Sequence, residues 1–274
     1  IYLRIEDNKN IKNLIGKYKN IIEPLYVNNA EKETNYFELQ KIQNDYVNGI
    51  INKLKNDKNN LITHILANLD DDELIFFPNG INYFYREINN YNNFTNYNIQ
   101  NIESCYLNTS NNIFKSPYFS CNSKDFTSYV NGKSIGNLKK SLFSQGPHYF
   151  SIKDNHSLNP SNIIILHYES SCIKKWYKKF YNYYLNNLDQ VEKIPFIFYK
   201  ESIESFKNND IKKEDIWKRY KLVKYRNPDT LLKININKLP NILNKINLNL
   251  NLNLFFIDNF CSNNLCDYII NNYK

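Results

Sequence analysis

Residues 61–78, LITHILANLDDDELIFFP, join a nearly continuous apolar run to four consecutive acidic residues, Asp70, Asp71, Asp72 and Glu73. An apolar run of this length is typical of a central parallel strand that is covered on both faces. In such sheets, ligands lie beyond the carboxyl ends of the strands. The acidic residues follow the strand directly, and we therefore interpret them as a candidate functional site. The alternative is an exposed acidic turn or the first turn of a helix.

The sequence before this segment predicts a repeating pattern of strands and helices. Residues 1–5 and 21–27 read as short strands, and Pro24 indicates that the second lies at a sheet edge or contains a bulge. Apolar residues at steps of three and four predict a short helix at 11–18 and a longer one at 36–54. This alternation predicts an α/β fold with a mixed, mostly parallel sheet flanked by helices.

The middle of the chain is less regular, and its elements are predicted one by one. We expect strands at 99–107 and 163–166, and a loop with a hairpin at 114–131 that ends in an Asn131-Gly132 turn. Helices are expected after residue 172, with Trp176 and Phe180 buried, and near 213–222. At 248–254, Asn and Leu alternate, which suits a strand but equally a low-complexity repeat.

Composition limits the range of functions. The chain has 274 residues and a formal net charge of +8. Its lysines are dispersed among Asn and acidic residues, which favours a solvated basic surface over a nucleic-acid site. No apolar run reaches the roughly 20 residues of a membrane span. The five cysteines show no metal-binding spacing, and their disulfide state stays open. The chain opens inside an apolar stretch without Met, so we expect a piece of a longer protein.

The acidic run suits a hard divalent cation. Mg²⁺ and Mn²⁺ prefer carboxylate oxygens, and a protein usually supplies only a few of their ligands. In an extended segment alternate side chains share a face. Asp70 and Asp72 would then point one way and hold the metal, while Asp71 points the other way. Glu73 would orient a ligand.

Four motifs in order resemble those of GT-A glycosyltransferases of the family 2-like and family 92-like group. Residues 69–78 are similar to LDxDEFxxP, 132–135 (GKSI) to KS(I/V), 146–150 (GPHYF) to G(V/I)HxF, and 167–180 to HYxxKSxxxFxxK. Together with the helix before the acidic run, the resemblance covers residues 40 to 182. The sequence departs from the pattern at Ser170, which replaces the lysine. The family's first strand and helix, which carry nucleotide-base contacts, would lie before Ile1.

The resemblance implies a GT-A domain over residues 1–190, followed by a C-terminal helical and low-complexity extension of unknown role over 191–274. It implies transfer of a sugar from a nucleotide-sugar donor to a glycan, protein or lipid acceptor, with Mn²⁺ or, alternatively, Mg²⁺ as cofactor. It also implies a location in the secretory pathway or at a membrane, with any anchor outside this chain. No nucleic-acid partner is expected.

The resemblance also assigns residues. The expected metal ligands are Asp70, Asp72 and His148, and the expected donor contacts are Asp7, Asp70, Glu73 and Lys133. We expect His148 rather than His167 to lie beside Asp72, because His167 is followed at once by a helix that must pack.

The catalytic base stays unassigned among Glu103, Asp125 and Asp154. An inverting transferase needs a carboxylate beside the acceptor hydroxyl, and nothing in the sequence ranks these three. Two alternatives to an active enzyme stay open. One is a catalytically degenerate domain of the same fold with a binding or structural role, and the other is a basic nucleic-acid-binding module.

Overall fold

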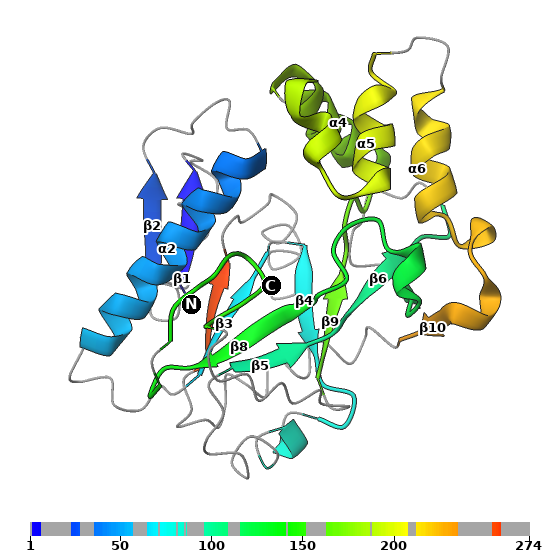
Figure 1. The fold of residues 1–274 in the computed structure, drawn as a ribbon. Helices are drawn as coiled ribbons and strands as arrows, with labels where there is room; N and C mark the ends of the chain where they lie inside the picture. The colour runs from blue at the N-terminus through cyan, green and yellow to red at the C-terminus, as the bar shows by residue number, and fades with distance from the viewer. Residues whose placement is uncertain are drawn as a thin grey trace, which may run out of the picture.

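The structure is a computed structural model, and the part of the chain that it describes is α/β, as expected from the sequence. The expectation of one mostly parallel sheet is wrong, because the strands form two sheets and the second is mostly antiparallel. The described residues are 2–6, 23–27, 36–56, 65–70, 72–80, 82–84, 86, 96–108, 116–140, 142–151, 163–186, 188–207, 212–234 and 254–258. They form two mixed β-sheets and helices that pack against them (Figure 1). The helix expected at 11–18 lies outside the described residues.

The first sheet has six strands in the order β2-β1-β11-β3-β8-β5. Their bounds are β1 Tyr2–Glu6, β2 Glu23–Val27, β3 Ile65–Leu69, β5 Asn96–Ile99, β8 Lys133–Asn137 and β11 Leu254–Asp258. β2, β1, β11 and β3 run parallel, and β8 runs antiparallel to both β3 and β5. β2 is an edge strand, as Pro24 predicted.

Helix α2, Tyr36–Asn56, covers part of this sheet (Figure 1). Its apolar residues recur at the predicted steps, and Val47, Ile50, Ile51 and Leu54 among them are buried. Val47, Ile51 and Leu54 pack in one cluster with Leu66 of β3 and with Phe150. The helical periodicity of the sequence therefore identified the correct helix and its buried face.

Strand β11 takes a place in the first sheet that its position in the sequence does not predict. It lies between β1 and β3 and is parallel to both. β11 shares only Leu254 with the alternating stretch 248–254, and residues 235–253 lie outside the described part of the chain, so the strand expected there stays a prediction. β3 is central as predicted, with a parallel neighbour on one side and an antiparallel one on the other.

The second sheet has five strands in the order β10-β7-β6-β9-β4. Their bounds are β4 Glu73–Phe76, β6 Asn101–Cys105, β7 Tyr118–Ser120, β9 Ile164–His167 and β10 Leu231–Lys233. The single strand expected at 99–107 is in fact two, because β5 and β6 flank Gln100 and pair in different sheets. β9 is parallel to β6 and antiparallel to β4.

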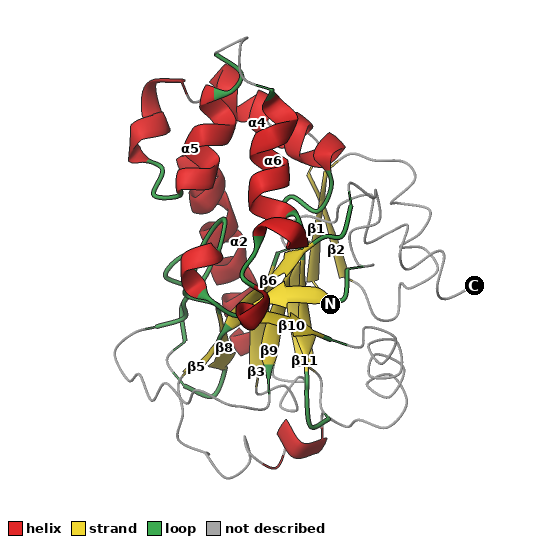
Figure 2. Ribbon diagram, turned by 90° about the vertical axis from the view of Figure 1, so that its right-hand side faces the viewer, coloured by secondary structure: helices red, strands yellow, loops and turns green. Residues whose placement is uncertain are grey.

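Three helices gather at one end of the second sheet (Figures 1 and 2). They are α4 Ile173–Asn186, α5 Ile197–Glu204 and α6 Lys213–Lys221. Single-turn 3₁₀ segments lie at Ser123–Asp125, Val223–Tyr225 and Pro228–Thr230, and a longer one at Leu188–Lys193. Trp176, Phe180, Phe198 and Trp217 share one buried cluster. Residues on both sides of position 190 therefore form a common core.

None of the helices in the described part of the chain is both long and apolar enough to cross a membrane.

Candidate functional site

The acidic run forms a tight turn between the two sheets. The backbone N–H of Glu73 donates to the Asp70 carbonyl at 3.1 Å, and the Asp70 N–H donates to the Glu73 carboxylate at 2.7 Å. The expectation that residues 70–72 are extended, with Asp70 and Asp72 sharing a face by strand alternation, is therefore wrong. β3 ends at Leu69 and β4 begins at Glu73. Asp71 lies outside the described residues.

Lys133 neutralises one side of this turn. Its Nζ lies 2.6 Å from the Asp70 carboxylate and 3.4 Å from that of Glu73, and its side chain is 1% exposed. Gly132 makes this placement possible, because it has φ +65° and a Cβ there would lie 1.8 Å from the Ile99 carbonyl oxygen. The bend at Asn131 and the left-handed backbone of Gly132 agree with the turn signal read from the sequence, and Lys133 follows directly.

Burial and the lysine oppose each other in setting these pKa values. Burial alone would raise the pKa of Asp70, but the charge of Lys133 holds it below its usual value. For Glu73, burial outweighs the lysine and raises the pKa well above the usual range. Burial would lower the pKa of Lys133, and the two carboxylates raise it instead.

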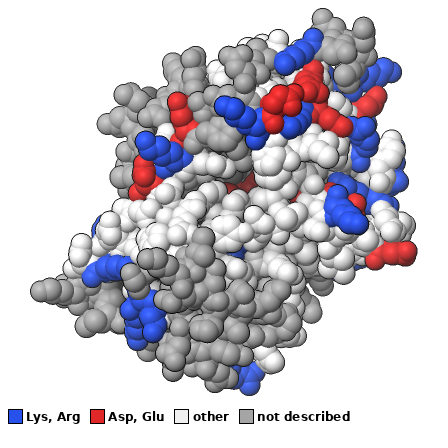
Figure 3. Space-filling view, viewed as in Figure 1, with Lys and Arg blue, Asp and Glu red and all other residues white. Residues whose placement is uncertain are grey.

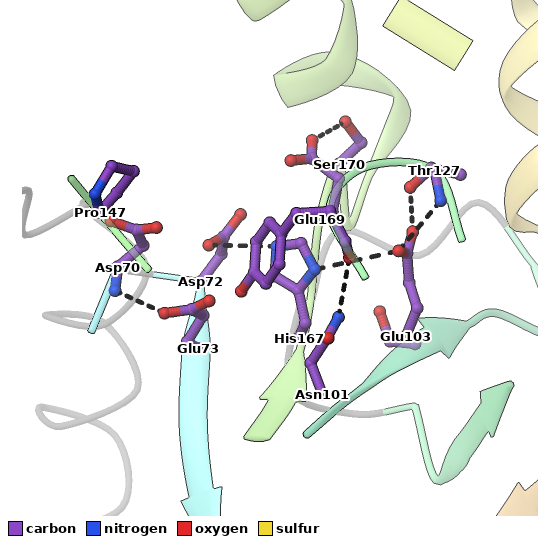
Figure 4. Close-up of polar contacts among 12 residues, drawn as sticks. Asp70, Asp72, Glu73, Asn101, Glu103, Thr127, Pro147, His167, Glu169 and Ser170 are labelled. Atoms are coloured by element: carbon purple, nitrogen blue, oxygen red, sulfur yellow. Dashed lines mark hydrogen bonds and ion pairs between the residues drawn. The ribbon is translucent and has the colours of Figure 1, made fainter. Parts of the chain in front are cut away.

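The other side of the turn faces a second group of ligand atoms. Asp72, His167 and Glu169 each present one, and all three atoms lie within 4.8 Å of one another. The His167 Nε2 is 3.7 Å from the Asp72 Oδ1. Figure 4 shows His167 between Asp72 and Glu103, with Glu169 above it. The strand register explains the approach, since His167 of β9 pairs with Glu73 of β4 next to the acidic turn.

Glu169 is held by three other side chains. The Lys179 Nζ lies 3.0 Å from both carboxylate oxygens, the Tyr199 hydroxyl donates to Oε2 at 2.8 Å, and the Ser170 hydroxyl donates to Oε1. Burial would raise the pKa of Glu169, but the Lys179 charge and these donors lower it to about 2. Ser170 adopts a left-handed backbone, with φ 50°. Glu169 is therefore a fixed carboxylate.

His148 does not lie where the sequence interpretation placed it. Its Nδ1 lies 2.9 Å from the Gly132 carbonyl oxygen, and the Tyr129 ring packs against both His148 and His167, with ring centroids 4.1 and 4.8 Å away. Burial and the nearby Lys133 charge lower the pKa of His148 to about 4. The expectation that His148 rather than His167 would lie beside Asp72 is wrong, because the strand pairing of β9 brings His167 there.

The carboxylates considered as catalytic bases have different environments. Glu103 is 1% exposed and is bonded to the Lys221 Nζ at 2.9 Å and to the Thr127 N–H at 3.0 Å. Burial would raise the pKa of Glu103, but the Lys221 charge lowers it. Asp125 accepts hydrogen bonds from the hydroxyls of Ser120 and Thr230. Asp154, like Asp7 among the expected donor contacts, lies outside the described residues.

Asp72 differs from the other carboxylates of the site. Lys133, Lys221 and Lys179 lie within 4.0 Å of the remaining four, which are Asp70, Glu73, Glu103 and Glu169. Among the described residues, no lysine or arginine nitrogen lies within 4.0 Å of Asp72, whose side chain is 24% exposed. Burial raises the pKa of Asp72 despite His167. With every group ionised, five carboxylates face three ammonium groups, which leaves an excess of two negative charges.

Sequence reasoning missed the two lysines that neutralise Glu169 and Glu103. Lys179 lies on α4 three residues after the buried Trp176, and Lys221 ends α6 four residues after the buried Trp217. Residues three and four apart lie on the same side of a helix. A lysine on an otherwise apolar helical face was therefore the signal that pointed to both residues.

One face of the molecule carries charges of both signs (Figure 3). On the face shown in Figure 3, the basic and acidic side chains of the described residues lie interspersed. Comparison of the chain with protein-family models, with curated proteins and with solved structures gives no match.

Proposed function

We propose that the chain is a metal-dependent glycosyltransferase of the GT-A type, which transfers a sugar from a nucleotide-sugar donor to an acceptor. The observation that carries this proposal is the environment of Asp72. Its carboxylate has solvent access and no ammonium partner within 4.0 Å among the described residues, and it faces the Nε2 of His167 and the carboxylate of Glu169. A divalent cation there would balance the two excess negative charges.

The donor atoms fit a divalent ion. Two carboxylates and one imidazole suit Mn²⁺, which accepts nitrogen more readily than Mg²⁺ does. Adjacent ligands of an ion with bonds of about 2.1 Å lie about 3 Å apart. The three ligand atoms lie within 4.8 Å of one another, so Asp72 and His167 would need to move slightly toward the fixed Glu169. The proposed ligands are therefore Asp72, His167 and Glu169, and the bound ion would stabilise the charge of the departing diphosphate.

The order of strands supports a nucleotide site at the same edge. If β1 is the second strand of a doubly wound sheet, the order β2-β1-β11-β3 corresponds to 3-2-1-4, with β11 in the place of the first strand. In such sheets the ligand binds beside the carboxyl ends of the strands, at the position where the strand order reverses. That position lies between β11 and β3, and Asp70 follows β3 directly.

The side of the turn that contacts Lys133, which we call the closed side, offers hydrogen-bond acceptors for a sugar. The Asp70 Oδ1 and the Glu73 Oε1 are buried without a hydrogen-bond partner, although the second oxygen of each carboxylate is bonded. Buried acceptors of this kind are costly unless a ligand or water satisfies them. In our proposal they accept hydrogen bonds from donor-sugar hydroxyls, and Lys133 holds both carboxylates in position.

The experiment measures release of nucleoside diphosphate from a panel of nucleotide sugars with and without Mn²⁺. The parent chain should release it in a Mn²⁺-dependent manner, and Asp72→Asn should not, while the surface variant Asp229→Asn should match the parent. Binding of Mn²⁺ and nucleoside diphosphate without turnover would instead indicate a catalytically degenerate domain. A parent chain that binds neither overturns the proposal. Tight, sequence-selective nucleic-acid binding at physiological salt would favour the alternative of a basic nucleic-acid-binding module.

A further inference from the structure

Glu103 lies behind His167, on the side away from Asp72 (Figure 4). Its Oε2 is 3.9 Å from the His167 Nδ1, while the His167 Nε2 is 3.7 Å from Asp72. The backbone fixes the Glu103 half of this row, because His167 of β9 pairs directly with Glu103 of β6, and its partner on the other side is Glu73 of β4, the residue after Asp72. Directly paired residues present their side chains on the same face of a sheet.

The position of Glu103 is itself tightly determined. Its Oε1 accepts from the Lys221 Nζ at 2.9 Å and from the Thr127 hydroxyl, and its Oε2 accepts from the Thr127 N–H at 3.0 Å. The side chains of Glu103 and Lys221 are 1% and 0% exposed. A carboxylate that is buried and held by three donors cannot approach an acceptor sugar without breaking these bonds. Glu103 therefore has another role than that of a catalytic base.

The His167 ring beside Glu103 indicates what this buried carboxylate does. Its Nδ1 is buried and has no hydrogen-bond partner at the distances of this structure. A neutral imidazole carries one N–H donor and one acceptor nitrogen, and its surroundings select which nitrogen holds the proton. Within the described part of the chain, Glu103 is the only carboxylate within 4.0 Å of Nδ1.

We propose that Glu103 is a positioning residue that keeps the His167 proton on Nδ1, so that the Nε2 lone pair faces Asp72 and Glu169. A histidine binds a metal ion through its unprotonated nitrogen, and a carboxylate on the opposite nitrogen fixes the ring. The inference rests on the metal site of the proposed function, but the proton on Nδ1 is a property of the metal-free protein. The two can therefore be tested separately.

The first test determines the His167 tautomer without metal. Histidine labelled with ¹⁵N is incorporated, and correlations between ring nitrogens and ring protons are recorded, with the His167 signals assigned by their loss in His167→Gln. The parent should show the proton on Nδ1. Glu103→Gln/Lys221→Met, which removes both charges of the buried pair together, should shift the proton toward Nε2. A parent with the proton on Nε2, or a variant with an unchanged tautomer, overturns the inference.

The second test measures Mn²⁺ affinity by calorimetry. Glu103→Gln and the double variant should each lower the affinity about 10- to 100-fold, the usual effect of losing such a partner. Neither should lower it further in a His167→Gln background, where a purely structural defect would still act. Glu214→Gln, which removes a surface partner of Lys218, is the matched control and should bind like the parent. A parent that shows the Nδ1 tautomer but binds no Mn²⁺ contradicts the proposed function and leaves the positioning role supported.

Discussion

The two sides of the acidic turn neutralise their carboxylates in different ways. On the β8 side, Asp70 and Glu73 share the buried Lys133. On the β9 side, Asp72 faces His167 and has no ammonium partner within 4.0 Å among the described residues. Within this turn, the carboxylates that share the buried Lys133 have less charge to offer a metal ion than Asp72, which has no such cation. For the two sides of the turn, the comparison therefore separates residues expected to affect stability from those expected to affect Mn²⁺ binding.

The largest expected effect on stability tests the closed side. Lys133→Met leaves the carboxylates of Asp70 and Glu73 without their cation and should lower the free energy of unfolding by about 3–5 kcal/mol. Urea denaturation measures it. Lys218→Met removes an exposed lysine that pairs with Glu214 and should cost less than about 1 kcal/mol. Equal losses in the two variants would contradict the role given to Lys133.

The next prediction concerns the histidine on the closed side. The pKa of His148 is lowered from 6.5 to about 4, so between these pH values the unfolded chain binds a proton that the folded chain does not. Stability should therefore fall as the pH drops from about 6.5 to about 4, by at most about 3.4 kcal/mol from this group. His148→Gln does not titrate and should show a shallower decline in urea denaturation across this range. Parallel curves for parent and variant would argue against a buried neutral His148.

Mn²⁺ affinity should depend on the side of the turn where Asp72 faces His167, which we call the open side. Asp72→Asn should lower Mn²⁺ affinity about 100-fold, or about 2.7 kcal/mol, because it removes a charged ligand. Its stability should stay within about 0.5 kcal/mol of the parent, since burial already disfavours the Asp72 charge and raises the pKa of this group. Asp70→Asn should show the opposite pattern, with a loss of stability and less than a tenfold change in affinity. Calorimetry and urea denaturation on both variants decide the matter.

Predictions from the sequence were correct where a local pattern determines the structure. The steps of three and four predicted α2 and its buried face, Pro24 predicted the edge strand β2, and Gly132 marked a turn that only glycine can make. The position of the acidic run after β3 was also predictable, because an apolar run followed by charges marks a strand end.

Features that depend on long-range packing were not predictable from the sequence. The strand expected at 99–107 runs across Gln100, where the chain passes from β5 in one sheet to β6 in the other. The insertion of β11 beside β3 joins segments far apart in the sequence. The choice between His148 and His167 depended on the register of β9 against β4, which no single segment encodes.

The smallest effect is expected at the partners of Glu169. The Tyr199 hydroxyl accepts from Lys179 and donates to Glu169, both at 2.8 Å. Tyr199→Phe removes these bonds and keeps the ring that packs against Phe180. Loss of one buried hydroxyl costs about 1 kcal/mol of stability. Because Lys179 and Ser170 still hold Glu169, Mn²⁺ affinity should fall only about two- to fivefold, within the 0.5–1.5 kcal/mol of one hydrogen bond.

Tyr106→Phe is the matched control for this last variant. The Tyr106 hydroxyl is buried too, but its partner is the Ser104 hydroxyl, 2.7 Å away, and neither residue belongs to the proposed metal site. Removing it should cost a similar amount of stability and leave Mn²⁺ affinity unchanged. If the two variants change affinity equally, the effect of Tyr199 is one of general packing. If only Tyr199→Phe weakens binding, Glu169 contributes to the ion site through the geometry that its donors impose.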